Sequence, residues 1–302
     1  MSRISLDQIS TTVRGAITAP PGSMLVVSDL SSIESRLAGA LTGCLAINNI
    51  FAEGRDVYKD LATKIYHIQY EEVTKEQRTF AKPAALGAQY MLGGRGLVKY
   101  AEGYGVELSP DEAKYQIEVY REAYPDIPTC WYWLKDAIFD VVKGILPEVT
   151  GYGLRIAMGK EFMTIQLPSG RKLYYYEPKI IWGEAPWTDI NGDTTQIEKF
   201  SYMGKDAFSF QWRRITAHAG GVFENIIQAV ARDVLAIWMT RADRDGFNLV
   251  GHCHDEIIGL EKEDNADQWL DYINHLATVP IDWAPGLLLT AEGYVAKRYR
   301  KD

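Results

Sequence analysis

The sequence predicts an α+β fold, in which an antiparallel sheet carries two acidic strand ends and a largely helical region lies between them along the chain. Three observations predict it. An apolar stretch at 24–29 ends in Asp29, and two apolar flanks at 249–260 enclose a His-Asp-Glu cluster, a pattern typical of a β-hairpin. Between these segments, helix-capping sequences and apolar residues four positions apart predict several helices.

Length and charge place this fold in a broad class. The 302 residues can form one large domain or two closely packed domains with a substantial core. A formal net charge of −8 argues against a protein that only coats nucleic acid. Local basic clusters remain, namely Arg78, Lys82, Arg95 and Lys99, and a tail of Lys297, Arg298, Arg300 and Lys301.

Cysteine usage and hydropathy predict where the protein resides. Three cysteines without metal-ligand spacing indicate a reducing compartment. The N-terminus lacks the pattern of a signal peptide, and no run of about 18 apolar residues offers a membrane span. We therefore expect a soluble cytoplasmic protein with no membrane partner.

The first elements are a strand and two helices. After a polar lead at 1–23, the strand at 24–29 leads through a capping box at 31–34 into a helix. Apolar spacing predicts a second helix at 56–66. The apolar faces are predicted to be Ile33, Leu37, Ala40 and Leu41 in the first helix, and Val57, Leu61 and Ile65 in the second.

A basic and aromatic stripe marks the helix that a capping box at 74–77 opens. Steps of four residues place its members along one side: Arg78, Lys82, Leu86 and Tyr90. Pro83 lies within this helix and lacks a backbone donor, so it predicts a kink or an irregular first turn.

The second half of the chain mixes helices and strands. The glycine-rich run at 93–96 lacks the Lys-Ser/Thr ending of a P-loop and is interpreted as a helix exit. The residues at 181–204 are predicted to form a loop. We predict helices from 109–112 onward, near 129–142, at 219–242 and near 265–277. The apolar face of the helix at 219–242 is predicted to be Val222, Ile226, Ala229 and Val230. Strands are predicted within 161–178, around a turn at 168–171, and near 287–294.

Asp29 and Asp255 are the candidate metal ligands. Adjacent carboxylates at a turn repel one another, but they suit a hard divalent cation such as Mg²⁺, which takes oxygen ligands. Two strand-borne aspartates that lie far apart in the sequence are what a two-metal phosphoryl-transfer site requires. The alternative is that each aspartate only ends a strand or caps a turn.

The stripe on the helix opened at 74–77 fits a nucleoside triphosphate. Arg78 and Lys82 could meet phosphate oxygens, and Tyr90 could pack under a base. The alternative is the solvated basic face of an amphipathic helix. Three further polar residues also have ordinary explanations, as cap or surface residues: Glu34, Gln228 and His254.

The order of these blocks is more specific than any one of them. First comes Asp29-Leu30-Ser31-Ser32-Ile33-Glu34-Ser35-Arg36, then Arg78-x-x-x-Lys82-x-x-x-Leu86-Gly87-x-x-Tyr90, then a helix with Gln228, and last His254-Asp255-Glu256. From about residue 10 to the C-terminus, this order resembles the polymerase core of family A DNA polymerases, the DNA polymerase I type. The resemblance is closest to their phage and prophage branch.

The resemblance implies a right-hand polymerase core of palm and fingers. The palm would comprise residues 1–55 and 216–302, and the fingers residues 56–215, with an inserted hairpin near 161–178. The implied activity is template-directed DNA synthesis from deoxynucleoside triphosphates (dNTPs) on primer-template DNA. The implied cofactors are two Mg²⁺ ions, for which Mn²⁺ could substitute.

The resemblance also implies a role for each matching residue. Asp29 and Asp255 would be catalytic and would hold both metals, with the carbonyl group of Leu30 as a further ligand. Arg78 and Lys82 would bind the incoming triphosphate, and Lys82 would also donate a proton to pyrophosphate. The remaining implied roles are sugar selection by Glu34, nucleotide contact by Leu86, control of the templating position by Tyr90, and DNA contacts by Gln228, His254 and Arg36.

Four positions depart from the family pattern. Leu86 stands where an aromatic residue is usual, and Pro83 follows the lysine. Met91 replaces the glycine that usually follows the tyrosine, and Glu224 takes the place of a minor-groove asparagine. These departures predict altered contacts to the sugar and to the DNA minor groove.

The resemblance predicts that part of the family architecture is missing. Only 28 residues precede Asp29, too few for the thumb and the 3′–5′ exonuclease domain that this family carries upstream. We expect a catalytic fragment or one subunit of a split polymerase, acting in a bacterial host cytoplasm if phage-encoded, with a second polypeptide supplying the thumb or exonuclease. Two rivals are a single-subunit RNA polymerase core, against which Glu34 argues, and a non-catalytic module that binds DNA or a replisome.

Overall fold

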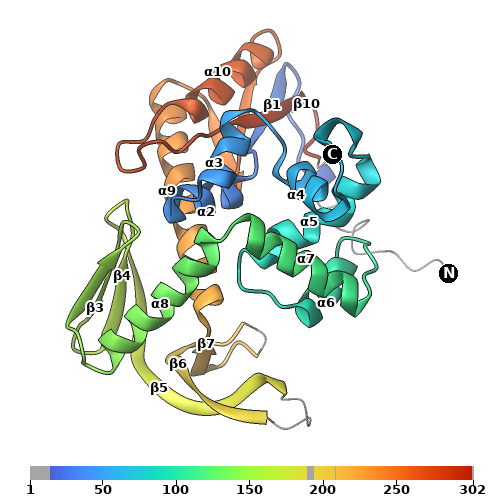
Figure 1. Ribbon diagram of the computed structural model, residues 1–302. Coiled ribbons are helices and arrows are strands. Elements are labelled where there is room, and N and C mark those ends of the chain that lie inside the picture. Colours follow the sequence, from blue (N-terminus) through green and yellow to red (C-terminus); the bar gives the residue numbers. More distant parts are fainter. Residues whose placement is uncertain (1–13, 189–193, 208, 301–302) are drawn as a thin grey trace, which may run out of the picture. The chain divides into compact units, whose positions relative to one another are not determined.

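The computed structural model describes residues 14–188, 194–207 and 209–300 and divides into two compact units (Figure 1). One unit consists of Met1–Glu34 and Ala231–Asp302, and the other of Ser35–Val230. The first unit therefore takes residues from both ends of the chain. Each unit has its own antiparallel sheet, which confirms the predicted α+β class.

A four-stranded antiparallel sheet organises the first unit. Its strands are β1 (Ser23–Leu30), β8 (Leu249–Cys253), β9 (Glu256–Lys262) and β10 (Ala291–Ala296), in the spatial order β10-β1-β9-β8. The predicted first strand, the acidic hairpin and a last strand are thus confirmed. The register places Asp29 on β1 opposite Glu256 on β9 and Glu292 on β10.

Buried apolar side chains stabilise this sheet. Leu25 and Val27 of β1 form a buried cluster with Ile258 and Tyr299. Helix α10 (Ala266–Thr278), the helix predicted near 265–277, packs on β1 and β10. The buried indole of Trp238 donates from Nε1 to the carbonyl oxygen of Ile273 at 2.8 Å, which ties this helix to α9 (Ala219–Arg244).

Helices form the N-terminal part of the second unit. Their bounds are α2 (Ile33–Thr42, which starts in the first unit), α3 (Leu45–Ala52), α4 (Val57–Tyr66), the short 3₁₀ helix η1 (Tyr70–Glu72), α5 (Lys75–Ala88), α6 (Gly94–Glu102), α7 (Pro110–Ala123) and α8 (Asp126–Val142). The capping box predicted before α5 is confirmed, and so are the N-cap and proline signals predicted before α7, where the structure also has a capping box. In the first, Thr74 Oγ1 accepts from the Gln77 amide at 3.2 Å, and Gln77 Oε1 accepts from the Thr74 amide at 2.9 Å.

Three details of the helices differ from the sequence predictions. Ala40 is exposed, because the buried side of α2 runs through Arg36 and Ala38 instead. The glycine run at 93–96 starts a helix rather than ending one, since Gly93 is the N-cap of α6. Helix α5 continues through the buried Pro83 and begins with both capping hydrogen bonds made. The prediction of an irregular first turn is therefore wrong. A kink at this proline stays a prediction.

A six-stranded antiparallel sheet forms the C-terminal part of the second unit, with strands in chain order. They are β2 (Glu148–Gly151), β3 (Leu154–Met158), β4 (Phe162–Gln166), β5 (Lys172–Thr188), β6 (Thr194–Lys205) and β7 (Trp212–Ala217). The predicted hairpin with its turn at 168–171 is β4–β5. Helix α8 packs against β2, β3 and β5 (Figure 1).

The loop predicted at 181–204 is wrong, because β5 and β6 pair through most of this stretch. Burial does not alternate along β6, since its first three residues are exposed and the neighbouring Phe200 and Ser201 are both buried, so the strand lacks the clear alternation that marks a half-buried strand in a sequence. Main-chain pairing with β5 and β7 keeps β6 in the extended conformation of a strand. Residues 189–193 of the predicted loop lie outside the described residues, as do Lys301 of the basic tail and residues 1–13 of the polar lead.

No helix within the described part of the chain is both long and apolar enough to cross a membrane.

Candidate functional site

The acidic end of the four-stranded sheet is built by a tight turn. Strand β8 ends at Cys253 and β9 begins at Glu256, so His254 and Asp255 alone connect them. His254 has a φ of 56°, in the left-handed region that tight hairpin turns use. The amide of Leu30 donates to the main-chain oxygen of Asp255 at 3.1 Å, which fixes this turn against the end of β1.

Negative charge is concentrated at this end of the sheet. The pKa of the Asp29 carboxyl is raised, first by partial desolvation and then by the charges of Asp255, Glu256 and Glu292. The structure therefore brings together Asp29 and Asp255, as the sequence predicted, with Glu256 of the same acidic cluster beside them, and adds Glu292 on β10. A cation at this edge would relieve the repulsion among these carboxylates.

Glu256 accepts a hydrogen bond from a residue that no sequence pattern singles out. The buried Tyr299 hydroxyl donates to Glu256 Oε1. Burial, together with this hydrogen bond and the glutamate charge, raises the pKa of Tyr299. A tyrosine within a basic tail is the only sequence signal for this contact, and it does not indicate a partner.

The residues present fit a divalent metal in chemistry. Within the described ranges, no group of three or more His, Cys, Asp and Glu side chains is arranged to hold a metal ion. Mg²⁺, however, is usually bound by one or two carboxylates, with substrate phosphates and water completing its shell. Asp29 and Asp255 supply that donor set, in an environment whose charge favours a cation.

The predicted triphosphate stripe lies on α5, in the second unit. Arg78 donates to Asp56 Oδ2 from Nε at 3.0 Å and from Nη2 at 2.6 Å, and its guanidinium lies over the Tyr58 ring. The Lys82 ammonium lies 5.4 Å from the centroid of the same ring and 5.8 Å from that of Tyr104. These rings and Asp56 hold both cations along one side of the helix.

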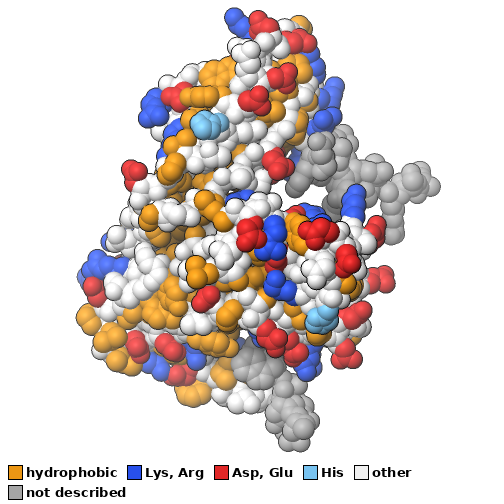
Figure 2. All heavy atoms as spheres, turned by 45° about the horizontal axis from the view of Figure 1, so that its top comes forward, with side chains coloured by type: hydrophobic (Ala, Val, Ile, Leu, Met, Phe, Trp, Pro, Cys, Tyr) orange, Lys and Arg blue, Asp and Glu red, His pale blue; other side chains and the backbone are white. Residues whose placement is uncertain are grey.

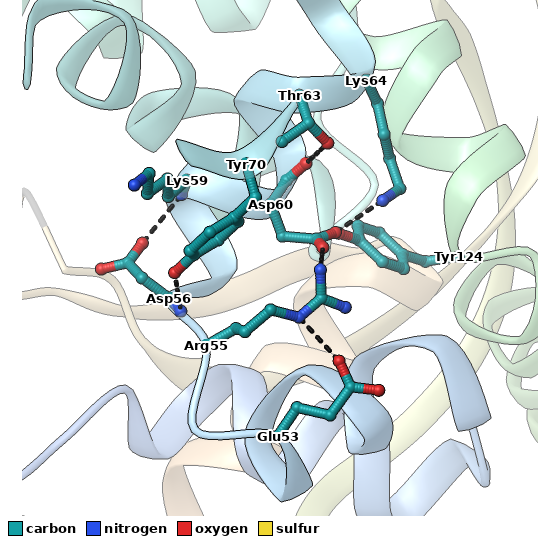
Figure 3. A network of polar contacts seen from close by, with 9 residues as sticks. All are labelled: Glu53, Arg55, Asp56, Lys59, Asp60, Thr63, Lys64, Tyr70 and Tyr124. Carbon is teal, nitrogen blue, oxygen red and sulfur yellow. Dashed lines mark hydrogen bonds and ion pairs between the residues drawn. The ribbon is translucent and has the colours of Figure 1, made fainter. Parts of the chain in front are cut away.

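Asp56 also belongs to a network at the start of α4 (Figure 3). Its Oδ1 accepts from the Lys59 amide at 2.8 Å, so it caps this helix, and its own amide donates to the Tyr70 hydroxyl at 2.9 Å. One turn on, Asp60 is only 2% exposed. It pairs with Arg55 at 2.9 Å and with Lys64 at 2.6 Å, and it accepts from the Tyr124 hydroxyl at 3.2 Å.

This network was missed by the sequence analysis, although part of its signal is visible. Asp56 stands directly before a predicted helix, as N-cap aspartates do. Its second role, as the partner of Arg78, joins residues 22 positions apart, and no local pattern predicts that contact.

The end of α5 is fixed around Tyr90. The buried Trp131 indole donates to the carbonyl oxygen of Gln89 at 2.9 Å, and the Tyr90 ring lies 6.3 Å from that of Phe223 on α9. Gly220 allows this approach, since a Cβ at that position would lie 2.2 Å from the Tyr90 carbonyl oxygen and 2.4 Å from Met91 Cβ. Leu86 lies half-buried one turn before Tyr90.

Gly220→Ala is expected to lower the free energy of unfolding by about 1–3 kcal/mol, because the added methyl group must displace the main chain of Tyr90. Thermal unfolding followed by circular dichroism measures this loss. Gly221→Ala is the matched control, since the nearest atom to its Cβ is 3.8 Å away in the His218 ring. Equal melting temperatures for the two variants would contradict the prediction.

The remaining predicted residues lie on several elements. Glu34 lies in the first turn of α2, and Arg36 is buried on the same helix with its guanidinium 4.1 Å from the centroid of the Phe51 ring. Burial lowers the pKa of Arg36. Gln228 on α9 and His254 at the hairpin turn are both exposed.

The predicted residues thus fall into two sets, one in each compact unit. Asp29, Leu30, Glu34, His254 and Asp255 belong to the first unit. The second unit holds Arg36, Arg78, Lys82, Leu86, Tyr90 and Gln228.

Comparison with solved structures identifies the class of this fold. Over 98% of its length, the chain has the fold of a DNA polymerase domain: it resembles the POL domain of Pol1 from M. smegmatis, in a structure described as a complex with DNA primer-template and dNTP. The TM-score is 0.62, the sequence identity is 17%, and 44% of that chain is covered.

Sequence comparisons show which family the chain is similar to. The model of DNA polymerase family A matches residues 2–139, and this chain is a relative of the family A DNA polymerases. It is 32% identical to the DNA polymerase of Bacillus phage SP02 over 297 residues, which are 97% of this chain and 44% of the phage protein. It is 35% identical to DNA polymerase I of Aquifex aeolicus over 121 residues, 40% of this chain and 20% of that enzyme. The chain thus spans less than half the length of these relatives.

Proposed function

We propose that this chain is the catalytic core of a template-directed DNA polymerase. The observation that carries the proposal is the approach of Asp29 and Asp255 at the end of one antiparallel sheet, in a relative of the family A polymerases. The primer 3′-hydroxyl attacks the α-phosphate of a bound dNTP, the bond to the β-phosphate oxygen breaks, and pyrophosphate leaves.

Asp29 and Asp255, with the carbonyl group of Leu30, are the proposed holders of two Mg²⁺ ions, which Mn²⁺ could replace. When bound, such ions lower the pKa of the attacking hydroxyl and neutralise charge on the leaving group. By holding these ions, the two carboxylates would orient the primer end. Glu34 occupies the place of a ribose 2′-hydroxyl and so selects deoxyribonucleotides.

The α5 residues bind and position the nucleotide in this proposal. Arg78 and Lys82 meet the triphosphate oxygens as charged donors, and Lys82 donates a proton to pyrophosphate. Leu86 packs against the nucleotide and Tyr90 controls the templating position. Gln228, His254 and Arg36 contact the primer-template DNA.

The relation of Arg78 to Asp56 bears on this role. Asp56 holds the Arg78 guanidinium in place through two hydrogen bonds. The arginine side chain is therefore already in one conformation before a triphosphate binds. Such preorganisation lowers the entropy cost of binding.

A second polypeptide that supplies a thumb, an exonuclease or both is part of the proposal, since the chain matches less than half of the phage relative. Palm and fingers alone offer few phosphate contacts, so weak binding of DNA is expected. Action in the cytoplasm of a bacterial host stays a prediction.

Primer extension tests the proposal. The 302-residue chain, with Mg²⁺ and dNTPs at low salt, is expected to extend a primer by template-directed steps and to stop when EDTA removes the metal. Ribonucleoside triphosphates in place of dNTPs are expected to fail, and their efficient use would favour an RNA polymerase. The same reactions are run with the N-terminal part of the phage SP02 polymerase added. No extension in either arm would contradict the proposal and favour a DNA-binding module.

A further inference from the structure

The six-stranded sheet has one buried face and one open face. Met163, Ile165 and Tyr175 on one face are buried, and α8 packs against the same sheet. The opposite face, called here the outer face, is defined by the cross-strand pairs Phe162–Tyr176, Thr164–Tyr174 and Gln166–Lys172, and by Met203 and Lys205 with their partners Arg214 and Trp212.

Aromatic rings run across the outer face. Tyr174 is 63% exposed and Trp212 is 62% exposed, and Phe162 is 36% exposed. Ring centroids are 5.9 Å apart for Phe162 and Tyr174, 5.0 Å for Phe162 and Tyr176, and 6.3 Å for Tyr176 and Trp212. A contiguous row of exposed rings is costly in water and marks a binding surface rather than chance exposure.

A hollow lies beside this row. Its volume is about 380 Å³, and Phe162 lines it together with Lys160, Lys172, Thr164 and Gln166. The two lysines make no ion pair with any described residue, whereas Arg155 at the same hollow pairs with Glu148. The size suits one nucleotide, and the lining combines a ring with cations and polar groups.

The charges favour an anionic ligand on a protein that is acidic overall. Arg214 pairs with Glu177 at 3.5 Å, and the Lys205 ammonium lies 5.2 Å from the centroid of the Phe210 ring. Of the acidic residues, Glu161 alone among the described residues lines the hollow. Figure 2 shows hydrophobic, basic and acidic side chains exposed together at the left edge of the view, where Figure 1 draws β3 and β4.

Rings that stack on bases, with cations that meet phosphates, are the combination by which proteins bind unpaired strands. A duplex hides its base faces, so this surface favours a single strand over a double strand. We infer that the outer face binds single-stranded DNA, with bases stacked on Phe162, Tyr174 and Trp212 and backbone phosphates at Lys160 and Lys172. The surface contains none of the proposed catalytic residues, so it binds whether or not the chain extends primers.

The first test measures affinity for fluorescein-labelled oligothymidylate by anisotropy, with the full chain. Tyr174→Ala combined with Trp212→Ala is expected to weaken binding at least tenfold, since each stacked base depends on its ring. The matched control is Trp182→Ala, which removes an equally exposed ring, at 69%, from the opposite face of β5. Unchanged affinity in the double variant, or equal losses in both variants, would overturn the inference.

A second readout separates this surface from the proposed active site. Lys160→Ala combined with Lys172→Ala is expected to reduce the slope of log affinity against log salt concentration by about two, because two phosphate contacts are lost. Photo-crosslinking of an oligonucleotide that carries 5-iododeoxyuridine is expected to label peptides with Phe162, Tyr174 or Trp212, and labels confined elsewhere would refute the inference. The aromatic variant should still add one nucleotide to a primer-template with a single unpaired base. If the wild-type chain extends no primer yet shows these labels, the proposed function fails while this inference stands.

Discussion

Asp255→Asn and Asp29→Asn are each expected to reduce nucleotide incorporation by roughly 10³-fold or more, because each removes a proposed metal ligand and its charge. The fold should survive. The bond that fixes the hairpin turn is made by the main-chain oxygen of residue 255, which asparagine retains. Loss of one negative charge also reduces the repulsion that raises the pKa of Asp29, so the metal-free variants should melt no lower than the wild type.

Three measurements separate catalysis from folding in these variants. Single-nucleotide incorporation gives the rate, and anisotropy of labelled primer-template should show affinity within about threefold of the wild type, as expected if the fold is intact. Added Mg²⁺ should raise the melting temperature of the wild type and have a smaller effect on the variants, because a ligand stabilises the state that binds it. Asp282→Asn, at an exposed carboxylate of the same unit, is the control. Incorporation at the wild-type rate by either variant would contradict the assignment of Asp29 and Asp255 as metal ligands.

Asp60→Ala is expected to destabilise the helical part of the second unit strongly. Asp60 is buried and bonded to Arg55, Lys64 and the hydroxyl of Tyr124. Removing one member of a buried pair leaves the others uncompensated, at a cost of about 3–5 kcal/mol. The side chains of Arg55 and Lys64 are 34% and 36% exposed and can regain water, so the lower value, about 3 kcal/mol, is expected.

A loss of that size should lower the melting temperature by roughly 6–12 °C. Hydrogen exchange should show the amides of α4 opening more often, since Asp60 fixes the first turns of this helix. Asp136→Ala, at an exposed position on α8, is expected to change the melting temperature little. Asp60→Asn should fall between the two, because an amide can still accept from Tyr124. A melting curve for Asp60→Ala that matches the Asp136 variant would contradict this account.

Local signals in the sequence predicted the elements of this fold well. The capping box at Thr74, the proline after Ser109 and the apolar steps at Val57, Leu61 and Ile65 all act within one or two helical turns, and each is confirmed. The part of β5 beyond residue 178 and the whole of β6 were missed, because their order depends largely on main-chain pairing between the two strands.

The candidate site divides in the same way. Asp29 and Asp255 were predicted to meet because both lie at strand ends, and the register of β1 and β9 brings them to one edge. The contacts of Arg78 with Asp56, and of Tyr299 with Glu256, were beyond prediction. Both join side chains from separate elements, and the polar or aromatic residues involved are common on any surface.

The first unit takes its strands from both ends of the chain, and this has a consequence for how the protein is made. Strand β1 is made before the second unit, but its partners β9 and β10 follow only after roughly 200 more residues, so closing this sheet carries a large loop entropy. The second unit, being continuous, can fold while synthesis continues. The edge that carries both aspartates can therefore assemble only after the whole second unit has been made, and a nascent chain gains its proposed chemistry only once β9 and β10 have followed.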